Sequence, residues 1–302
     1  MAHSTHARTL PAELGAPPAV DRWRARALTV GVIFAVIAAV LALLDREPNV
    51  PALDHVLRGW TLGMMLTFGW SVGGLALLMV GYCSGGKWAL LLRRPLEAMT
   101  RSLWLVFGYW LVVALFQGRL YMWSNHAIVD KDLSLGLINR DQVEFIDHCI
   151  RFKHGMLNPA MFWISGLVCF AIWGYYTWHM NRLALKRDAD SPVNTPYWIK
   201  KFENISGPGI VVYSLTMTAA VIYWVMSMDV TWFSSIYGLL FLVGQGFSVL
   251  ALSIIVVISL SREGHTVRPN HIGVALQRHR RAGRLEQRDQ SWYPPAQSGT
   301  TG

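Results

Sequence analysis

A single carboxylate lies in the longest apolar region of the chain. Between residues 204 and 261 the only Asp, Glu, Lys or Arg is Asp229, which lies close to the hydroxyl residues Ser227 and Thr231. Polar groups near membrane spans are functional candidates by default, because removing them from water is costly unless they find partners. A carboxylate with hydroxyl neighbours could relay protons. It could equally cap the helix that follows it.

Four further polar residues complete this set of proton-path or polar-cluster candidates. Tyr223 and Ser227 add hydroxyl groups that could line half of a proton path, and Ser234 lies in the same turn as Asp229. Lys153 ends the longest polar segment between two apolar regions, residues 119–153. We expect these side chains to form the polar cluster of the protein.

The sequence shows no arrangement that indicates catalysis or metal binding by this chain. No nucleophile can be placed beside a base, and no paired carboxylates can be assembled. Cys83, Cys149 and Cys169 are far apart, with no C-x-x-C or C-x-x-C-H motif for a thiolate cluster or a covalent c-type haem. We therefore predict no catalytic, cofactor-binding or metal-binding residues.

The elements that must position these residues are membrane helices. Of 302 residues, 53% are hydrophobic and 15% are charged, against about 25% charged residues in soluble domains. The charge-free intervals are residues 27–44, 59–86, 102–118, 154–181, 204–228 and 230–261. Each interval can hold one span of roughly 20 residues, and the runs lack the alternation of a β-barrel. The sequence predicts an all-α polytopic membrane helix bundle with about six transmembrane helices over residues 26–261.

Basic residues predict the orientation of this bundle. Most of the 27 Lys and Arg lie in the N-terminal tail, the second and fourth loops and the C-terminal tail. The positive-inside rule therefore predicts that both termini are cytoplasmic. This topology accounts for the net charge of +9 without nucleic acid as a partner. We expect disordered cytoplasmic tails at residues 1–25 and 262–302, the second of them basic.

The glycine, amphipathic and aromatic patterns of the sequence predict how individual helices pack and where they lie. The glycines of residues 59–74 predict a groove for close helix packing. Residues 87–99 read as an interfacial amphipathic helix with its arginines towards anionic lipid, and the apolar spacing around Ile146 predicts a helix on the outer surface. The aromatic residues of the span at 157–180 favour packing and a boundary belt, although a quinone could stack there.

Three stretches of the sequence carry a resemblance to a known family: residues 86–99, residues 153–158 followed by Phe162, and residues 224–238. In these stretches the chain resembles the F subunits of bacterial alternative complex III, which belong with the polysulfide-reductase-type membrane proteins. The last stretch is the most specific, since the family typically has D-W-x-M-S-L-E-P-x-W-F-S-T-x-Y-G there. The matching positions are Trp224, Met226, Ser227, Trp232, Phe233, Ser234, Tyr237 and Gly238, with Asp229 for the family's Glu.

Two substitutions and the length of the chain depart from this pattern. Tyr223 stands where the family often has Asp, which removes an acid from any proton path, and Val230 replaces a proline. The family subunit is similar to a ten-helix protein, whereas the likeness here covers about residues 25–261. We expect a form that is shortened at its C-terminus.

The resemblance implies a non-catalytic, multi-pass subunit of a respiratory quinol:cytochrome c oxidoreductase in the bacterial inner membrane. It would pack beside membrane lipid and a related quinol-oxidising subunit, and support electron transport and possible proton movement. The chain would have no redox centre of its own, and a quinone could lie at an interface. The resemblance places haem c and iron–sulfur clusters in a multihaem cytochrome and an iron–sulfur partner subunit. The alternatives are a small membrane transporter and a structural assembly subunit.

Overall fold

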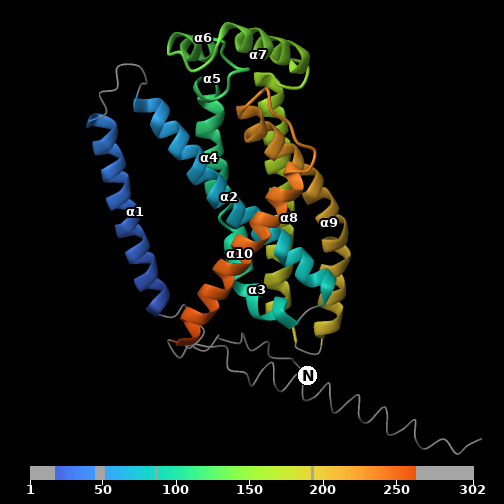
Figure 1. Cartoon of the computed structure of the whole chain (residues 1–302). Coiled ribbons are helices and arrows are strands. Elements are labelled where there is room, and N and C mark those ends of the chain that lie inside the picture. Colours follow the sequence, from blue (N-terminus) through green and yellow to red (C-terminus); the bar gives the residue numbers. More distant parts are fainter. Residues whose placement is uncertain (1–17, 45–51, 86, 192–193, 263–302) are drawn as a thin grey trace, which may run out of the picture. The chain divides into compact units, whose positions relative to one another are not determined.

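The regular elements of the protein are helices. A computed structural model describes residues 18–44, 52–85, 87–191 and 194–262, and no strand occurs within these ranges (Figure 1). Among the described residues, five helices are long and apolar enough to cross a membrane, or six if one bent pair counts as a span. The predicted all-α, multi-pass helix bundle is therefore confirmed. The predicted tails at residues 1–17 and 263–302 lie outside the described residues.

Contacts along the chain separate residues 28–257 from a second unit made of the two chain ends. The hydrophobic core of the bundle lies within residues 28–257. The ends of the chain contribute the first part of α1 (Pro18–Leu44) and the last part of α10 (Tyr237–Arg262). Residues 18–25 are helical, whereas a disordered tail was expected up to residue 25. Proline is well suited to the first turn of a helix, so Pro18 can begin α1 before its apolar segment.

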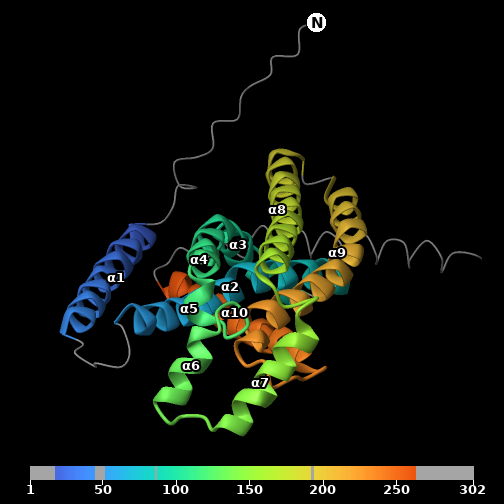
Figure 2. The ribbon, with the colours of Figure 1, turned by 90° about the horizontal axis from the view of Figure 1, so that it is seen from above.

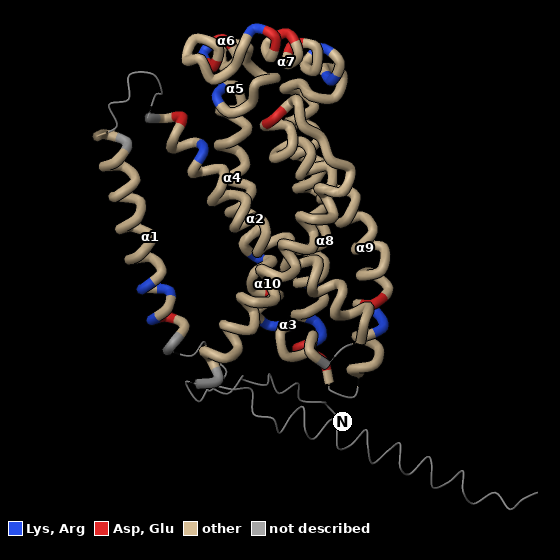
Figure 3. The backbone as a smooth tube through the Cα atoms, viewed as in Figure 1, with Lys and Arg blue, Asp and Glu red and all other residues tan. Residues whose placement is uncertain are grey.

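The long helices extend beyond the charge-free intervals that predict them. They are α2 (Ala52–Ser84), α8 (Pro159–Ala189) and α9 (Thr195–Trp224). Helices α8 and α9 extend over about 45 Å, which exceeds the roughly 30 Å of a hydrocarbon core. Their charged residues lie towards the helix ends (Figure 3). The first charged residue beyond an apolar interval therefore indicates where the helix leaves the lipid, whereas the helix itself continues further along the chain.

The interval at residues 102–118 does not form a full span by itself. Helix α4 (Leu103–Leu115) has 13 residues, or about 20 Å, which is too short to cross the membrane alone. It follows α3 (Lys87–Thr100) at an angle of 43°, so that the two helices form a bent pair. Helix α3 buries Leu96 and Glu97 and packs on α2. The expected helix at residues 87–99 is therefore present, and it packs within the bundle.

Aromatic side chains form the centre of the core. Trp224 of α9 lies 5.9 Å from Trp110 of α4 and 6.0 Å from Trp173 of α8, measured between ring centroids. Phe68 of α2 and Phe170 of α8 also contact Trp224. The residues of α8 thus serve packing, as expected, although several of them lie in the core and not in a boundary belt.

The glycine groove of α2 is confirmed in its second half. A methyl group at Gly73 would lie 3.0 Å from Val249 of α10, and one at Gly74 would lie 3.3 Å from Met99 of α3. At Gly59 and Gly63 such a group would meet no atom within 4 Å from the rest of the described structure, apart from the backbone of α2. Only the half of α2 that α3 and α10 approach therefore needs small residues.

Two short helices connect α4 to α8 at one end of the bundle. After the single turn α5 (Gln117–Leu120), α6 (Ala127–Ser134) and α7 (Arg140–Lys153) lie together at the end opposite α3 (Figures 1 and 2). The predicted helix around Ile146 is confirmed as α7, with Ile146 buried. His126 connects the two helices, since its Nε2 lies 2.6 Å from Asp147 Oδ1.

The contact between His126 and Asp147 predicts a pH-dependent connection of α6 to α7. Hydrogen bonding to Asp147 raises the pKa of His126, with Asp130 as a further carboxylate neighbour. The stabilisation is therefore complete below the ordinary histidine pKa and is lost as the pH rises through the raised value. We expect faster amide hydrogen exchange in residues 127–134 at about pH 8.5 than at about pH 5.5, after correction for intrinsic exchange.

His126→Gln should abolish this pH dependence, whereas His148→Gln on α7 should preserve it. The same pH dependence in wild type and His126→Gln would assign the effect to another group.

Candidate functional site

The residues predicted to carry chemistry lie in and around the connection between α9 and α10. The two consecutive spans predicted from the intervals 204–228 and 230–261 are present as α9 and α10, which with their connection are called the hairpin below. Helix α9 ends at Trp224, a 3-10 turn η3 (Met226–Met228) follows, and α10 begins at Tyr237. Trp224 is almost fully buried, and its backbone oxygen accepts a 2.8 Å hydrogen bond from the hydroxyl of Tyr121. This bond anchors the end of α9 in the aromatic core.

Asp229 is exposed in this connection and does not cap α10. Its Oδ1 accepts hydrogen bonds from the Oγ1 and the backbone N–H of Thr231, at 2.6 and 2.9 Å. These bonds, the hydroxyl bond foremost, lower the pKa of Asp229, with Lys153 as a weaker electrostatic contribution. The alternative of a cap for the next helix is wrong, because α10 begins only at Tyr237. The carboxylate instead closes a tight turn in the loop.

Lys153 is the one candidate from outside the hairpin that reaches it. Its Nζ donates a 2.7 Å hydrogen bond to the backbone oxygen of Val230, whose side chain is fully buried. The two residues are 77 positions apart in the chain. The last residue of α7 is thereby attached to the connection between α9 and α10.

The other hydroxyl candidates do not join this contact. Ser227 is buried, and its hydroxyl donates a 2.5 Å hydrogen bond to the backbone oxygen of Tyr223. Neither the Tyr223 nor the Ser234 hydroxyl has a side-chain hydrogen bond within the described part of the chain. The structure thus brings Lys153 to the Asp229 loop but does not join the five candidates in one hydrogen-bonded path.

A second polar cluster, which includes none of the predicted site residues, surrounds Glu97 of α3. Glu97 is 3% exposed. Its Oε1 lies 3.0 Å from Arg187 Nη2 of α8 and 3.7 Å from Arg93 Nε, while its Oε2 lies 3.4 Å from Arg94 Nη1. Arg94 also forms a 2.7 Å ion pair with Asp188. Such pairing offsets the cost of burying the Glu97 carboxylate.

Arg187 extends this cluster to α2 and α9. Its Nη1 donates a 2.6 Å hydrogen bond to the hydroxyl of Tyr82, and its guanidinium lies 5.2 Å from the ring centre of Phe202. The rings of Tyr82 and Phe202 stack at 4.2 Å. Four helices, α2, α3, α8 and α9, therefore meet at Arg187.

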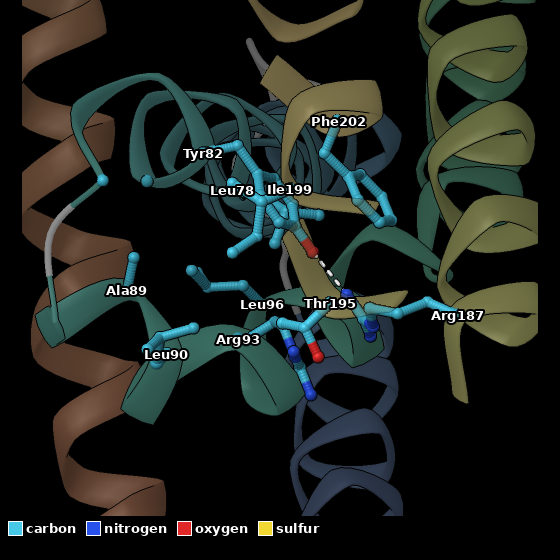
Figure 4. Close-up of a pocket in the computed structure, with 12 residues that line it drawn as sticks. Leu78, Tyr82, Ala89, Leu90, Arg93, Leu96, Arg187, Thr195, Ile199 and Phe202 are labelled. Atoms are coloured by element: carbon cyan, nitrogen blue, oxygen red, sulfur yellow. Dashed lines mark hydrogen bonds between the residues drawn. The ribbon is translucent and has the colours of Figure 1, made fainter. Parts of the chain in front are cut away.

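A cavity of about 130 Å³ lies against this cluster (Figure 4). Arg93, Arg187 and the hydroxyl residues Tyr82 and Thr195 are its polar lining residues. Its remaining lining residues are apolar or glycine: Leu78, Gly81, Gly85, Ala89, Leu90, Leu96, Ile199 and Phe202. The lining combines cationic groups with an apolar wall.

Part of this second cluster has a signal in the sequence. Arg93 and Arg94 precede Glu97 by four and three residues on a predicted helix, the spacing at which opposite charges pair. Arg187 has no such signal, since it lies 90 residues further along the chain than Glu97.

Within the described ranges, no group of three or more His, Cys, Asp and Glu residues could hold a metal ion. No protein-family model and no curated protein matches the sequence.

Proposed function

We propose that this chain is an integral membrane subunit of a respiratory quinol:cytochrome c oxidoreductase of the alternative complex III type. The proposed location is the bacterial inner membrane. In this role the chain supports quinol oxidation by partner subunits and holds no redox centre itself. The three stretches that resemble the family, residues 86–99, 153–158 and 224–238, suggest this assignment. Its structural support is that two of the three contact each other.

That contact is the hydrogen bond from Lys153 to the Val230 backbone oxygen, at 2.7 Å. Asn158 is the last residue of the stretch 153–158 and caps α8, since its Oδ1 accepts a 2.9 Å hydrogen bond from the backbone N–H of Met161. The residues of both stretches therefore hold α7, α8 and the hairpin together at one end of the bundle. A shared structural role of this kind is what a subunit scaffold requires.

A second cavity supports contact with a quinone tail. It has a volume of about 400 Å³ and a largely apolar lining that includes Trp70, Met99 and Leu252. The hydroxyls of Thr67 and Ser102 in its lining already donate to backbone oxygens at 3.0 and 2.6 Å. We therefore assign it to an apolar chain and leave the quinol headgroup to a partner subunit.

Affinity purification of the tagged chain from its native membrane tests the assignment. We expect a multihaem cytochrome, an iron–sulfur subunit and a related membrane subunit to co-purify. A tagged unrelated multi-pass protein from the same membrane serves as the control. A chain that purifies alone or as a homo-oligomer would contradict the proposal and favour the transporter alternative.

Asp229→Asn in the native complex tests whether Asp229 takes part in proton transfer. We expect quinol oxidation and proton release to stay within about twofold of wild type, because asparagine keeps the Oδ1 acceptor for Thr231. Both rates would be measured in reconstituted vesicles. A loss of about tenfold or more would identify Asp229 as a proton-transferring group and would contradict its purely structural role.

A further inference from the structure

The cavity beside Glu97 has an excess of positive charge. In its polar cluster three guanidinium groups, those of Arg93, Arg94 and Arg187, face the two carboxylates of Glu97 and Asp188. Two of the three arginines line the cavity, and no carboxylate does. An anion in the cavity would balance this charge.

Arg93 has bonding capacity left. Its Nε lies 3.7 Å from Glu97 Oε1, beyond hydrogen-bond distance, and has no hydrogen-bond partner among the described residues. This nitrogen is itself enclosed, whereas the side chain as a whole is 25% exposed and lines the cavity. Arg187 differs, because its terminal nitrogens bond to Tyr82, Glu97 and Asp188. Arg93 is therefore the group best placed to bind an anion, with Arg187 held rigidly beside it.

The apolar wall indicates that this anion carries a hydrocarbon chain. Leu90 is 49% exposed and Ile199 is 46% exposed, so both offer apolar surface towards the outside of the bundle. Leu78, Leu96 and Phe202 also line the cavity (Figure 4), but their side chains are already buried in the bundle, so Leu90 and Ile199 are the apolar groups that a ligand would cover. A small soluble anion would leave these groups without a partner, whereas an acyl chain would cover them.

The place of the cavity in the fold agrees with a lipid headgroup. Its lining comes from the last turns of α2, the first turns of α3 and α9, and the end of α8. The flanking loops are those whose basic residues predict the cytoplasmic side. That leaflet is the one where anionic lipids attract basic residues.

We propose that this cavity binds an anionic phospholipid, with the phosphate at Arg93 beside Arg187 and an acyl chain along Leu90 and Ile199. The assignment does not depend on the function proposed above. It makes the lipid an integral link between α2, α3 and α9, because residues of all three helices line its site.

The test uses the full chain in detergent, with phosphatidylglycerol as the probe and phosphatidylcholine as the neutral comparison. Binding of each lipid is measured by native mass spectrometry at increasing lipid concentration. We expect phosphatidylglycerol to bind at least about tenfold more tightly, because its net negative charge is not cancelled by a choline group. Equal affinities for the two lipids would overturn the proposal.

Two variants distinguish the cavity from general surface charge. Arg93→Gln should weaken phosphatidylglycerol binding by about tenfold or more, since it removes a charged donor. Arg101→Gln removes the same charge from an exposed arginine outside the cavity lining and should change binding by less than about twofold. If both variants lost the same affinity for phosphatidylglycerol, the binding would come from general attraction to surface charge, and the assignment would be overturned.

A third variant tests the cavity without changing its charge. Leu90→Trp adds volume at a half-exposed position, where the fold can accept it, and should weaken binding as much as Arg93→Gln does. Unchanged binding in Leu90→Trp would overturn the proposed site.

Inorganic phosphate serves as the soluble competitor and should not displace phosphatidylglycerol when both are present at equal concentration. Displacement would identify a small-anion site and overturn the lipid assignment.

Discussion

Glu97→Gln is expected to destabilise the protein by about 3–5 kcal/mol, the cost of removing one partner from a buried ion pair. The carboxylate is 3% exposed and lies 3.0 Å from Arg187 Nη2. Glutamine keeps the shape of the side chain but removes its charge. Arg93 and Arg187 would then remain close together with less compensation, in a site that water reaches poorly.

The measurement is the free energy of unfolding in mixed micelles at increasing sodium dodecyl sulfate, followed by near-ultraviolet circular dichroism. Glu203→Gln is the matched control, because Glu203 pairs with Lys200 at 3.3 Å but its side chain is 44% exposed. We expect the control to cost less than about 1 kcal/mol. Similar losses in the two variants would contradict a special role for the Glu97 cluster.

Gly166→Ala is expected to cost at least about 1–3 kcal/mol, the usual penalty for excess volume in a packed core. A methyl group at Gly166 of α8 would lie 2.0 Å from Cζ2 of Trp110. Trp110 cannot easily move away, because it packs between Phe162, Phe170 and Trp224. The close approach of α8 to α4 therefore depends on the missing side chain.

Gly174→Ala on the same helix provides the control. Outside the backbone of α8 itself, no atom of the described residues lies within 4 Å of a methyl group at Gly174, so this change should be neutral or slightly stabilising through helix propensity. The thermal midpoints of the two variants in the same detergent give the comparison. A Gly166→Ala midpoint at or above that of Gly174→Ala would show that the indole can be displaced at little cost.

The fold was predictable from the sequence where a bilayer imposes one rule on many residues. Uncharged intervals of sufficient length gave the apolar helices, since lipid leaves backbone groups no other partners. The rule failed at residues 102–118, where length and apolar composition do not show that α4 is short and bent against α3. It also missed the polar ends of α8 and α9, because a helix can continue in water after leaving lipid.

The candidate site was predictable only in part, because tertiary contacts between distant segments leave little local signal. The resemblance pointed to Lys153 and to the stretch that contains Val230, and these residues do meet. Sequence spacing could have paired Arg93 with Glu97, but nothing local indicates Arg187. Asp229 shows the opposite error: a helix cap is a common use of aspartate, yet the loop continues to Tyr237.

The cluster of Trp110, Trp173 and Trp224 gives the protein an optical signal of its own native state. The indole rings of Trp110 and Trp173 lie 5.9 and 6.0 Å from that of Trp224, with interplanar angles of 42° and 87°. The transition dipoles of indole rings that are held this close and at fixed angles couple and give a near-ultraviolet circular dichroism signal. When the core fluctuates, this signal averages towards zero. Every variant described above can therefore be checked for correct packing in a spectrometer, without a label, a ligand or a partner.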